Sequence, residues 1–147
     1  MNIKRIKEEV RKIVLNLRKR EVLAVGLFGS LARGDFKEKS DIDIFIITNT
    51  ELTLKKQDEL YYTFSELIPK FGRDITVLVH DIESLKKVPS WQTLNLIKDA
   101  CFVYDSGRIK EVFKMILEKA EQYGIIYDSK EKVFKLKKPG RTIFSLK

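Results

Sequence analysis

Two aspartates on one predicted strand are the strongest chemical feature of this sequence. Asp41 and Asp43 alternate with Ile42 and Ile44 in an apolar run that continues to Thr48. Because strand side chains alternate between two faces, both carboxylates are expected on one face, roughly 6–7 Å apart along the chain. Two unpaired carboxylates this close would repel each other and are costly to bury. A hard divalent cation removes the repulsion, so the pair predicts a Mg²⁺ site.

A phosphate-binding turn is predicted just before this pair. Gly29 and Ser30 end a predicted strand and open a helical turn, where backbone N–H groups lack partners inside the helix. The glycine would let a phosphate approach the backbone, and the Ser30 hydroxyl would donate to a phosphate oxygen. Arg33, one turn later, would bind the same phosphates through its planar guanidinium. Taken alone, Gly29 and Ser30 also fit a plain turn followed by an ordinary N-cap serine.

A third carboxylate, Asp74, opens the third predicted strand. It would join the pair as a general base or as a further ligand of the metal that activates the attacking hydroxyl. The alternative is an ordinary strand-start aspartate paired with Arg73. We expect Asp41, Asp43 and Asp74 to converge on one sheet face, with Ser30 near them.

Together these residues resemble the signature of the nucleotidyltransferases related to DNA polymerase β, and most closely that of their smallest branch, the minimal nucleotidyltransferase (MNT) domains. The signature is an apolar residue and Gly-Ser, about ten further residues, Asp-x-Asp in a strand, and a third Asp opening a later strand. Its elements are met in order by Phe28-Gly29-Ser30, Asp41-Ile42-Asp43 and Asp74-Ile75. Residues 31–35 and Ser40 also resemble the residues that usually stand between these motifs in the family. The resemblance covers roughly residues 5–104.

The resemblance implies both a fold and a reaction. The fold is α/β (α+β), a small mixed sheet with flanking helices. The reaction is transfer of a nucleoside monophosphate from NTP, with ATP the expected donor, to a hydroxyl, with Mg²⁺ or Mn²⁺ and release of pyrophosphate. Asp41 and Asp43 would bind both metals and the triphosphate, Asp74 would serve the metal on the nucleophile side, and Gly29 and Ser30 would cradle the phosphates. In two-metal catalysis the ions lie roughly 3.5–4 Å apart.

Minimal domains of this family often act as antitoxins that transfer AMP to a HEPN partner protein, so a HEPN-type protein is the first acceptor to consider. A nucleic-acid end or a small molecule remains open as acceptor, and so does a homo-oligomer. An inactive partner-binding module is the competing hypothesis. A decayed site would be expected to lose at least one of Asp41, Asp43, Asp74 or Ser30, and all four are present.

Arg73 and His80 also match the R-x6-H ribonuclease motif of HEPN proteins. That motif lies on a helix in HEPN proteins, whereas here it spans a predicted strand. An offset of seven on a strand puts the two side chains on opposite faces, so we do not expect this motif to function.

The elements that position the site follow an α/β order in a single domain. Hydrophobic periodicity predicts an amphipathic helix, a helix that stops at Pro69 and Gly72, a short helix and a final helix. The helices are expected at 3–20, around 60–68, around 91–97 and at 109–120, and the strands at 22–28, 41–48, 74–79 and 101–104. The tail, with turns at Asp128-Ser129 and Pro139-Gly140, is predicted to form a small hairpin or arm. Residues 1–104 are expected to form the nucleotidyltransferase domain, and 105–147 an extension packed on it.

The composition and charge of the chain limit the kinds of partner and the cellular setting that we expect. The 147 residues carry a net charge of +8, and the excess is confined to the basic ends, residues 1–20 and 130–147. These ends leave nucleic acid open as a partner, although a solvated lysine-rich face explains them equally well. No uncharged apolar stretch is long enough for a membrane span, and no signal peptide is evident. The single cysteine, Cys101, lies in an apolar run and indicates a reduced, cytoplasmic setting.

Overall fold

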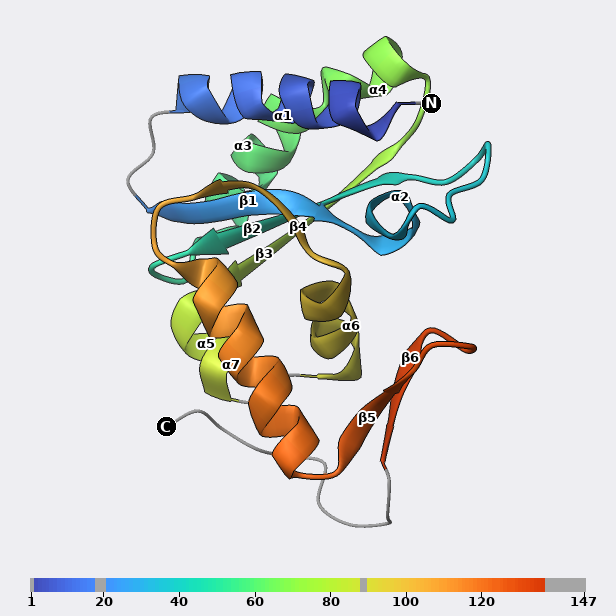
Figure 1. Ribbon diagram of the computed structural model, residues 1–147. Coiled ribbons are helices and arrows are strands. Elements are labelled where there is room, and N and C mark those ends of the chain that lie inside the picture. Colours follow the sequence, from blue (N-terminus) through green and yellow to red (C-terminus); the bar gives the residue numbers. More distant parts are fainter. Residues whose placement is uncertain (1, 18–20, 88–89, 137–147) are drawn as a thin grey trace.

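The computed structural model describes residues 2–17, 21–87 and 90–136. A four-stranded mixed sheet lies between two helical layers, with a two-stranded hairpin at its lower right (Figure 1). The helices are α1 (Ile3–Leu17), α2 (Gly29–Arg33), α3 (Leu54–Phe64), α4 (Leu67–Phe71), α5 (Ile82–Lys87), α6 (Trp91–Asp99) and α7 (Ile109–Gln122). The strands are β1 (Val22–Phe28), β2 (Ile42–Thr48), β3 (Ile75–Asp81), β4 (Cys101–Asp105), β5 (Ile125–Asp128) and β6 (Val133–Leu136).

The sheet has the strand order β3-β2-β1-β4. Strand β1 is antiparallel to both β2 and β4, whereas β2 and β3 are parallel. The predicted mixed sheet with flanking helices is therefore confirmed. The predicted strands agree closely with β1 to β4, although β2 begins one residue after Asp41.

Strand β2 separates two hydrophobic cores. Its residues Ile42, Ile44 and Ile46 pack with α1, α3 and α4, which cover one face of the sheet (Figure 1). Phe45 and Ile47 point to the other face and pack with α5, α6 and α7. A strand buried on both faces explains why its sequence is a nearly continuous apolar run.

The segment beyond residue 104 shares the second core. Helix α7 places Phe113 against two residues of the sheet, Phe45 and Phe102, with ring centroids 5.6 and 5.2 Å away. Strands β5 and β6 form the hairpin expected in the tail, and Asp128 caps its turn by accepting from the backbone N–H groups of Lys130 and Glu131. The predicted turn at Pro139-Gly140 lies outside the described residues.

The helix expected to stop at Pro69 is instead two helices. Helix α3 ends at Phe64, and the Ser65 hydroxyl donates to the Tyr62 carbonyl at 2.6 Å. Pro69 lies in the first turn of α4, where its missing N–H removes no helical hydrogen bond. Gly72, with a φ of 64°, then ends α4 in the left-handed region.

Helix α5 was not predicted. It follows β3 directly, and the Asp81 carboxylate accepts from the Ser84 backbone N–H at 3.0 Å at its start. Within the described ranges, no helix is both long and apolar enough to cross a membrane.

Candidate active site

Asp43 lies on the α5–α7 side of the sheet, where β2 begins between β1 and β3. It is the register partner of Phe28 on β1 and of Thr76 on β3. Alternation along β2 puts its side chain on the face of Phe45 and opposite to Ile42, as predicted from the sequence. Asp43 is the second residue of β2, which is one of the two central strands of the sheet.

Asp41 immediately precedes β2 and is exposed. The hydroxyl of Thr76 donates to Asp41 Oδ2 at 3.3 Å. Because directly paired residues of neighbouring strands project to the same side, Thr76 lies on the face of Asp43. The structure therefore brings Asp41 and Asp43 together around a threonine that the sequence analysis did not identify.

The two carboxylates interact electrostatically. Burial raises the pKa of the half-buried Asp43 carboxyl, and the negative charge of Asp41 raises it further. The Thr76 hydroxyl and the positive charge of Arg33 lower the pKa of Asp43 but do not reverse the shift. The arrangement is thus unfavourable for two ionised carboxylates without a cation.

Gly29 gives the Asp43 carboxylate its room. A Cβ at Gly29 would overlap Asp43 Oδ2 and would lie 3.2 Å from Asp43 Cγ. The φ of Gly29 is 71°, in the left-handed region that other residues rarely adopt. The backbone conformation and the position of the neighbouring carboxylate therefore both favour glycine here.

Ser30 is the second residue of α2, so the ordinary N-cap interpretation is wrong. The N-cap is Phe28, whose side chain makes no capping hydrogen bond. The Ser30 carbonyl accepts from the backbone N–H groups of Gly34 and Asp35 at 2.9 and 3.1 Å, which closes α2. Because Gly29 stands against the Asp43 carboxylate, the junction of β1 and α2 lies directly beside Asp43.

Arg33 is held by two carboxylates at the end of α2. Its Nε donates to Asp35 Oδ2 at 3.2 Å, and its Nη1 donates to Asp99 Oδ2, on α6, at 2.7 Å. Its charge still acts on Asp43. Asp99 could not be predicted as a partner of Arg33, because nothing in the local sequence indicates that α6 packs against α2.

Asp74 lies at the neighbouring strand end, just before β3, and is exposed. Its carbonyl accepts from the Ile42 backbone N–H at 2.9 Å, so its main chain adjoins the start of β2. Across the part of the chain that the structure describes, no three His, Cys, Asp or Glu side chains are grouped so as to hold a metal ion. The structure thus pairs Asp41 with Asp43, and a role for Asp74 remains a prediction.

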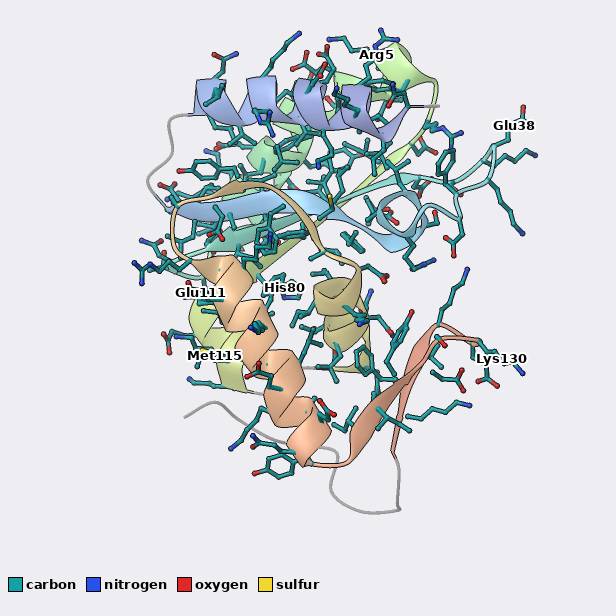
Figure 2. All side chains as sticks on the ribbon, in the orientation of Figure 1. Arg5, Glu38, His80, Glu111, Met115 and Lys130 are labelled. Carbon is teal, nitrogen blue, oxygen red and sulfur yellow. The ribbon has the colours of Figure 1, made fainter. Side chains whose placement is uncertain are left out.

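Arg73 holds the loop that leads into Asp41. Its Nη1 donates to the carbonyls of Lys37 and Ser40 at 2.7 and 2.9 Å, and its guanidinium lies 5.7 Å from the ring centroid of Phe36. His80 lies in β3 on the α5–α7 side of the sheet, and burial lowers its pKa (Figure 2). Arg73 and His80 therefore lie in different surroundings, as expected if the R-x6-H spacing has no function here.

The donor set fits a divalent cation. Asp41 and Asp43 supply carboxylate oxygens, which are the ligands that Mg²⁺ and Mn²⁺ prefer. In the metal-free protein the pKa of Asp43 is raised, so its ionised form is disfavoured. A bound cation would favour the ionised form and so offset this cost.

Comparison with known proteins identifies the family. The sequence model described as polymerase beta, nucleotidyltransferase matches residues 8–104. The chain belongs to this nucleotidyltransferase family. It is an enzyme of the nucleotidyltransferase class, and the resemblance seen in the Gly-Ser and Asp-x-Asp motifs is confirmed.

Relatives in Methanocaldococcus jannaschii are provisionally named protein adenylyltransferases. One is 35% identical over 88 residues, which is 60% of this chain and 82% of the relative. Another is 32% identical over 80 residues, which is 54% of this chain and 81% of the relative. Each alignment covers about four fifths of the relative but little more than half of this chain, so both relatives are shorter than its 147 residues.

Solved structures share the fold. A chain from the crystal structure of a toxin–antitoxin with AMP-PNP has a TM-score of 0.57 at 19% identity, covering 79% of this chain and 86% of that one. A chain from the complex of a tri-AMPylated Shewanella oneidensis HEPN toxin with an MNT antitoxin has a TM-score of 0.54 at 16% identity, covering 82% and 87%.

Proposed function

We propose that this nucleotidyltransferase transfers AMP from ATP to a hydroxyl group of a partner protein. The observation that carries the proposal is the Asp43 carboxylate seated against Gly29, with Asp41 beside it, in a chain of this family. The naming of its relatives as protein adenylyltransferases supports both AMP and a protein acceptor.

In this proposal each site residue has a defined role. Asp41 and Asp43 hold Mg²⁺ or Mn²⁺, and the backbone of Gly29 and the hydroxyl of Ser30 bind phosphate oxygens. Arg33, oriented by its two carboxylate partners, adds a positive charge beside the phosphates. The bound ion would neutralise the triphosphate and lower the pKa of the attacking hydroxyl.

The transfer itself is an in-line displacement at the α-phosphorus. A bond forms from the acceptor oxygen to this phosphorus as the bond from phosphorus to the oxygen bridging to the β-phosphate breaks. Pyrophosphate leaves, and the hydroxyl proton passes to a base. We assign Asp74 to the nucleophile side, as proton acceptor or further metal ligand, because its main chain adjoins the start of β2.

A HEPN-type protein is the acceptor that we propose. A chain of the same fold occurs in the complex of an MNT antitoxin with a tri-AMPylated HEPN toxin. We also place the enzyme in the cytoplasm, where ATP is available and Cys101 would remain reduced.

The test is transfer of label from each α-³²P-labelled NTP, with Mg²⁺, to a HEPN-type protein. We expect label from ATP to enter the acceptor, and Asp43→Asn to abolish the transfer while the variant stays folded. Oligonucleotides and small hydroxyl compounds serve as competing acceptors. A wild-type protein that binds the HEPN-type partner but labels no acceptor would support the inactive binding module instead.

A further inference from the structure

A cavity of about 480 Å³ lies beside the predicted phosphate-binding turn. It is open to solvent and is lined by the end of α2, the end of α6 and the β5–β6 hairpin, with α6 contacting both α2 and β6. Figure 1 shows the hairpin directly beneath α2, on the side of the sheet covered by α5 to α7. This is the side to which Asp43 projects, so the cavity and the aspartate pair share one face of the sheet.

Three cations line this cavity: Arg33 from α2, Lys98 from α6 and Lys132 from the hairpin. The Lys98 ammonium lies 5.3 Å from the ring centroid of Tyr127, which also lines the cavity. Lys132 donates to Asp35 Oδ2, the same oxygen that accepts from Arg33. Side chains from three separate segments thus bring positive charge to one space.

The two carboxylates of the cavity wall are paired with two of these cations, Arg33 and Lys132. The Asp99 side chain is only 8% exposed behind Arg33, and that of Asp35 is 30% exposed. The Lys132 side chain is 46% exposed and Lys98 is exposed as well. The carboxylates therefore orient Arg33 and Lys132, and the three cations and two carboxylates of the lining leave it a net charge of +1.

Arg33 joins the cavity to the aspartate pair. Its guanidinium contacts the cavity wall at Asp35 and Asp99, and its charge acts on the Asp43 carboxyl. Arg33 is thus common to the cavity lining and to the charged surroundings of Asp43, and an extended anion bound at Asp41 and Asp43 could reach the cavity past it. The triphosphate of an NTP is such an anion, and its outer phosphates need the most positive charge.

We propose that this cavity binds the β- and γ-phosphates of the NTP and the pyrophosphate released from it, with Lys98 and Lys132 as phosphate-binding residues. This assignment rests on the proposed function. It gives the segment from 105 to 136, which lies outside the family match, a direct part in substrate binding. The volume lies within the range of roughly 300–1,000 Å³ usual for small-molecule sites.

The experiment measures binding, separately from transfer. Calorimetry with Mg²⁺ compares pyrophosphate, ATP and AMP on the wild type, Lys98→Met and Lys132→Met. We expect each variant to bind pyrophosphate and ATP about tenfold more weakly, as for loss of one charge-assisted hydrogen bond. The affinity for AMP, which lacks the outer phosphates, should not change, and Lys132→Arg should restore binding.

Lys130→Met is the matched control. Lys130 belongs to the same hairpin turn, stands at its tip (Figure 2) and is not among the residues that line the cavity. It removes the same charge and should leave all three affinities unchanged. Thermal unfolding shows whether Lys132→Met destabilises the hairpin. If it does, the pyrophosphate affinity of Lys98→Met tests the proposal, because this variant breaks no ion pair with Asp35.

Wild-type affinity for pyrophosphate in both Lys98→Met and Lys132→Met would overturn this proposal, even if AMP transfer is observed. Equal weakening by Lys130→Met would also overturn it, because net charge alone would then explain the effect. Lysine-dependent pyrophosphate binding without transfer to any acceptor would retain the proposal and reject the acceptor assigned above.

Discussion

Gly29→Ala separates backbone strain from damage to the metal site. At a φ of 71°, any residue with a Cβ costs about 1–2 kcal/mol relative to glycine. Here the new Cβ would also overlap Asp43 Oδ2. The carboxylate is the far end of a flexible side chain, so it can rotate away at a further cost of about 0.5–1.5 kcal/mol. The rotation would take it out of the position it shares with Asp41.

Gly72→Ala is the matched control. Gly72 has a φ of 64°, and a Cβ there would meet nothing within 4 Å. Its cost is therefore the backbone term alone, about 1–2 kcal/mol, which lowers the melting temperature of a chain of this size by about 2–8 °C. We expect Gly29→Ala to lower it somewhat more.

The decisive difference concerns the metal. Mn²⁺ titration, followed by calorimetry and by thermal unfolding, should show wild-type binding in Gly72→Ala and a large loss in Gly29→Ala. Transfer of AMP should follow the same order. If Gly29→Ala matches Gly72→Ala in melting temperature and binds Mn²⁺ like the wild type, the close contact between Gly29 and Asp43 does not shape the metal site.

Three further predictions follow from the same site and its supporting sheet. Asp43→Asn should stabilise the metal-free protein at pH 7, because a pKa raised by folding means that ionisation opposes folding. Denaturant unfolding should show this advantage vanishing as pH falls below the ordinary Asp pKa of about 3.9, and equal stabilities at every pH would contradict it. Thr76→Val should weaken Mn²⁺ binding about tenfold in calorimetry, because residues that hydrogen-bond a metal ligand commonly contribute that much to metal affinity, and Thr76→Ser should restore it. Unchanged Mn²⁺ affinity in Thr76→Val would show that the Thr76 hydroxyl does not orient Asp41. Gly26→Ala should lower the free energy of unfolding by about 1–3 kcal/mol, because the new Cβ would lie 2.5 Å from the Cys101 carbonyl and from the Phe45 ring. Unchanged thermal unfolding would mean that β1 and β4 can move apart without cost.

The sequence predicts the parts of this fold whose cause is local. The alternation around Asp41 and Asp43 places the pair correctly, because strand side chains have a period of two whatever surrounds them. Helix α4 was harder to predict, since Pro69 usually marks a helix end but is tolerated in a first turn.

The parts that could not be predicted depend on distant segments. The hydrogen bond from Arg33 to Asp99 requires α6 to pack against α2. The donation from Thr76 to Asp41 depends on the register between β2 and β3, since a slip by one residue would turn Thr76 to the opposite face. The sequence indicated Asp74, just before β3, as the third group of the site, whereas only the register shows that Thr76 lies opposite Asp43.

The ion-pair network around Arg33 also bears on the order in which the protein folds. Arg33 and Asp99 are 66 residues apart in the chain, and Asp35 and Lys132 are 97 apart. Closing such long loops costs entropy before the contact gives anything back, so these pairs form late. During synthesis, at about 5–20 residues per second, the aspartate pair leaves the ribosome several seconds before Lys132 is made. The carboxylates of a nascent chain are therefore available before the last cation of the cavity has been made.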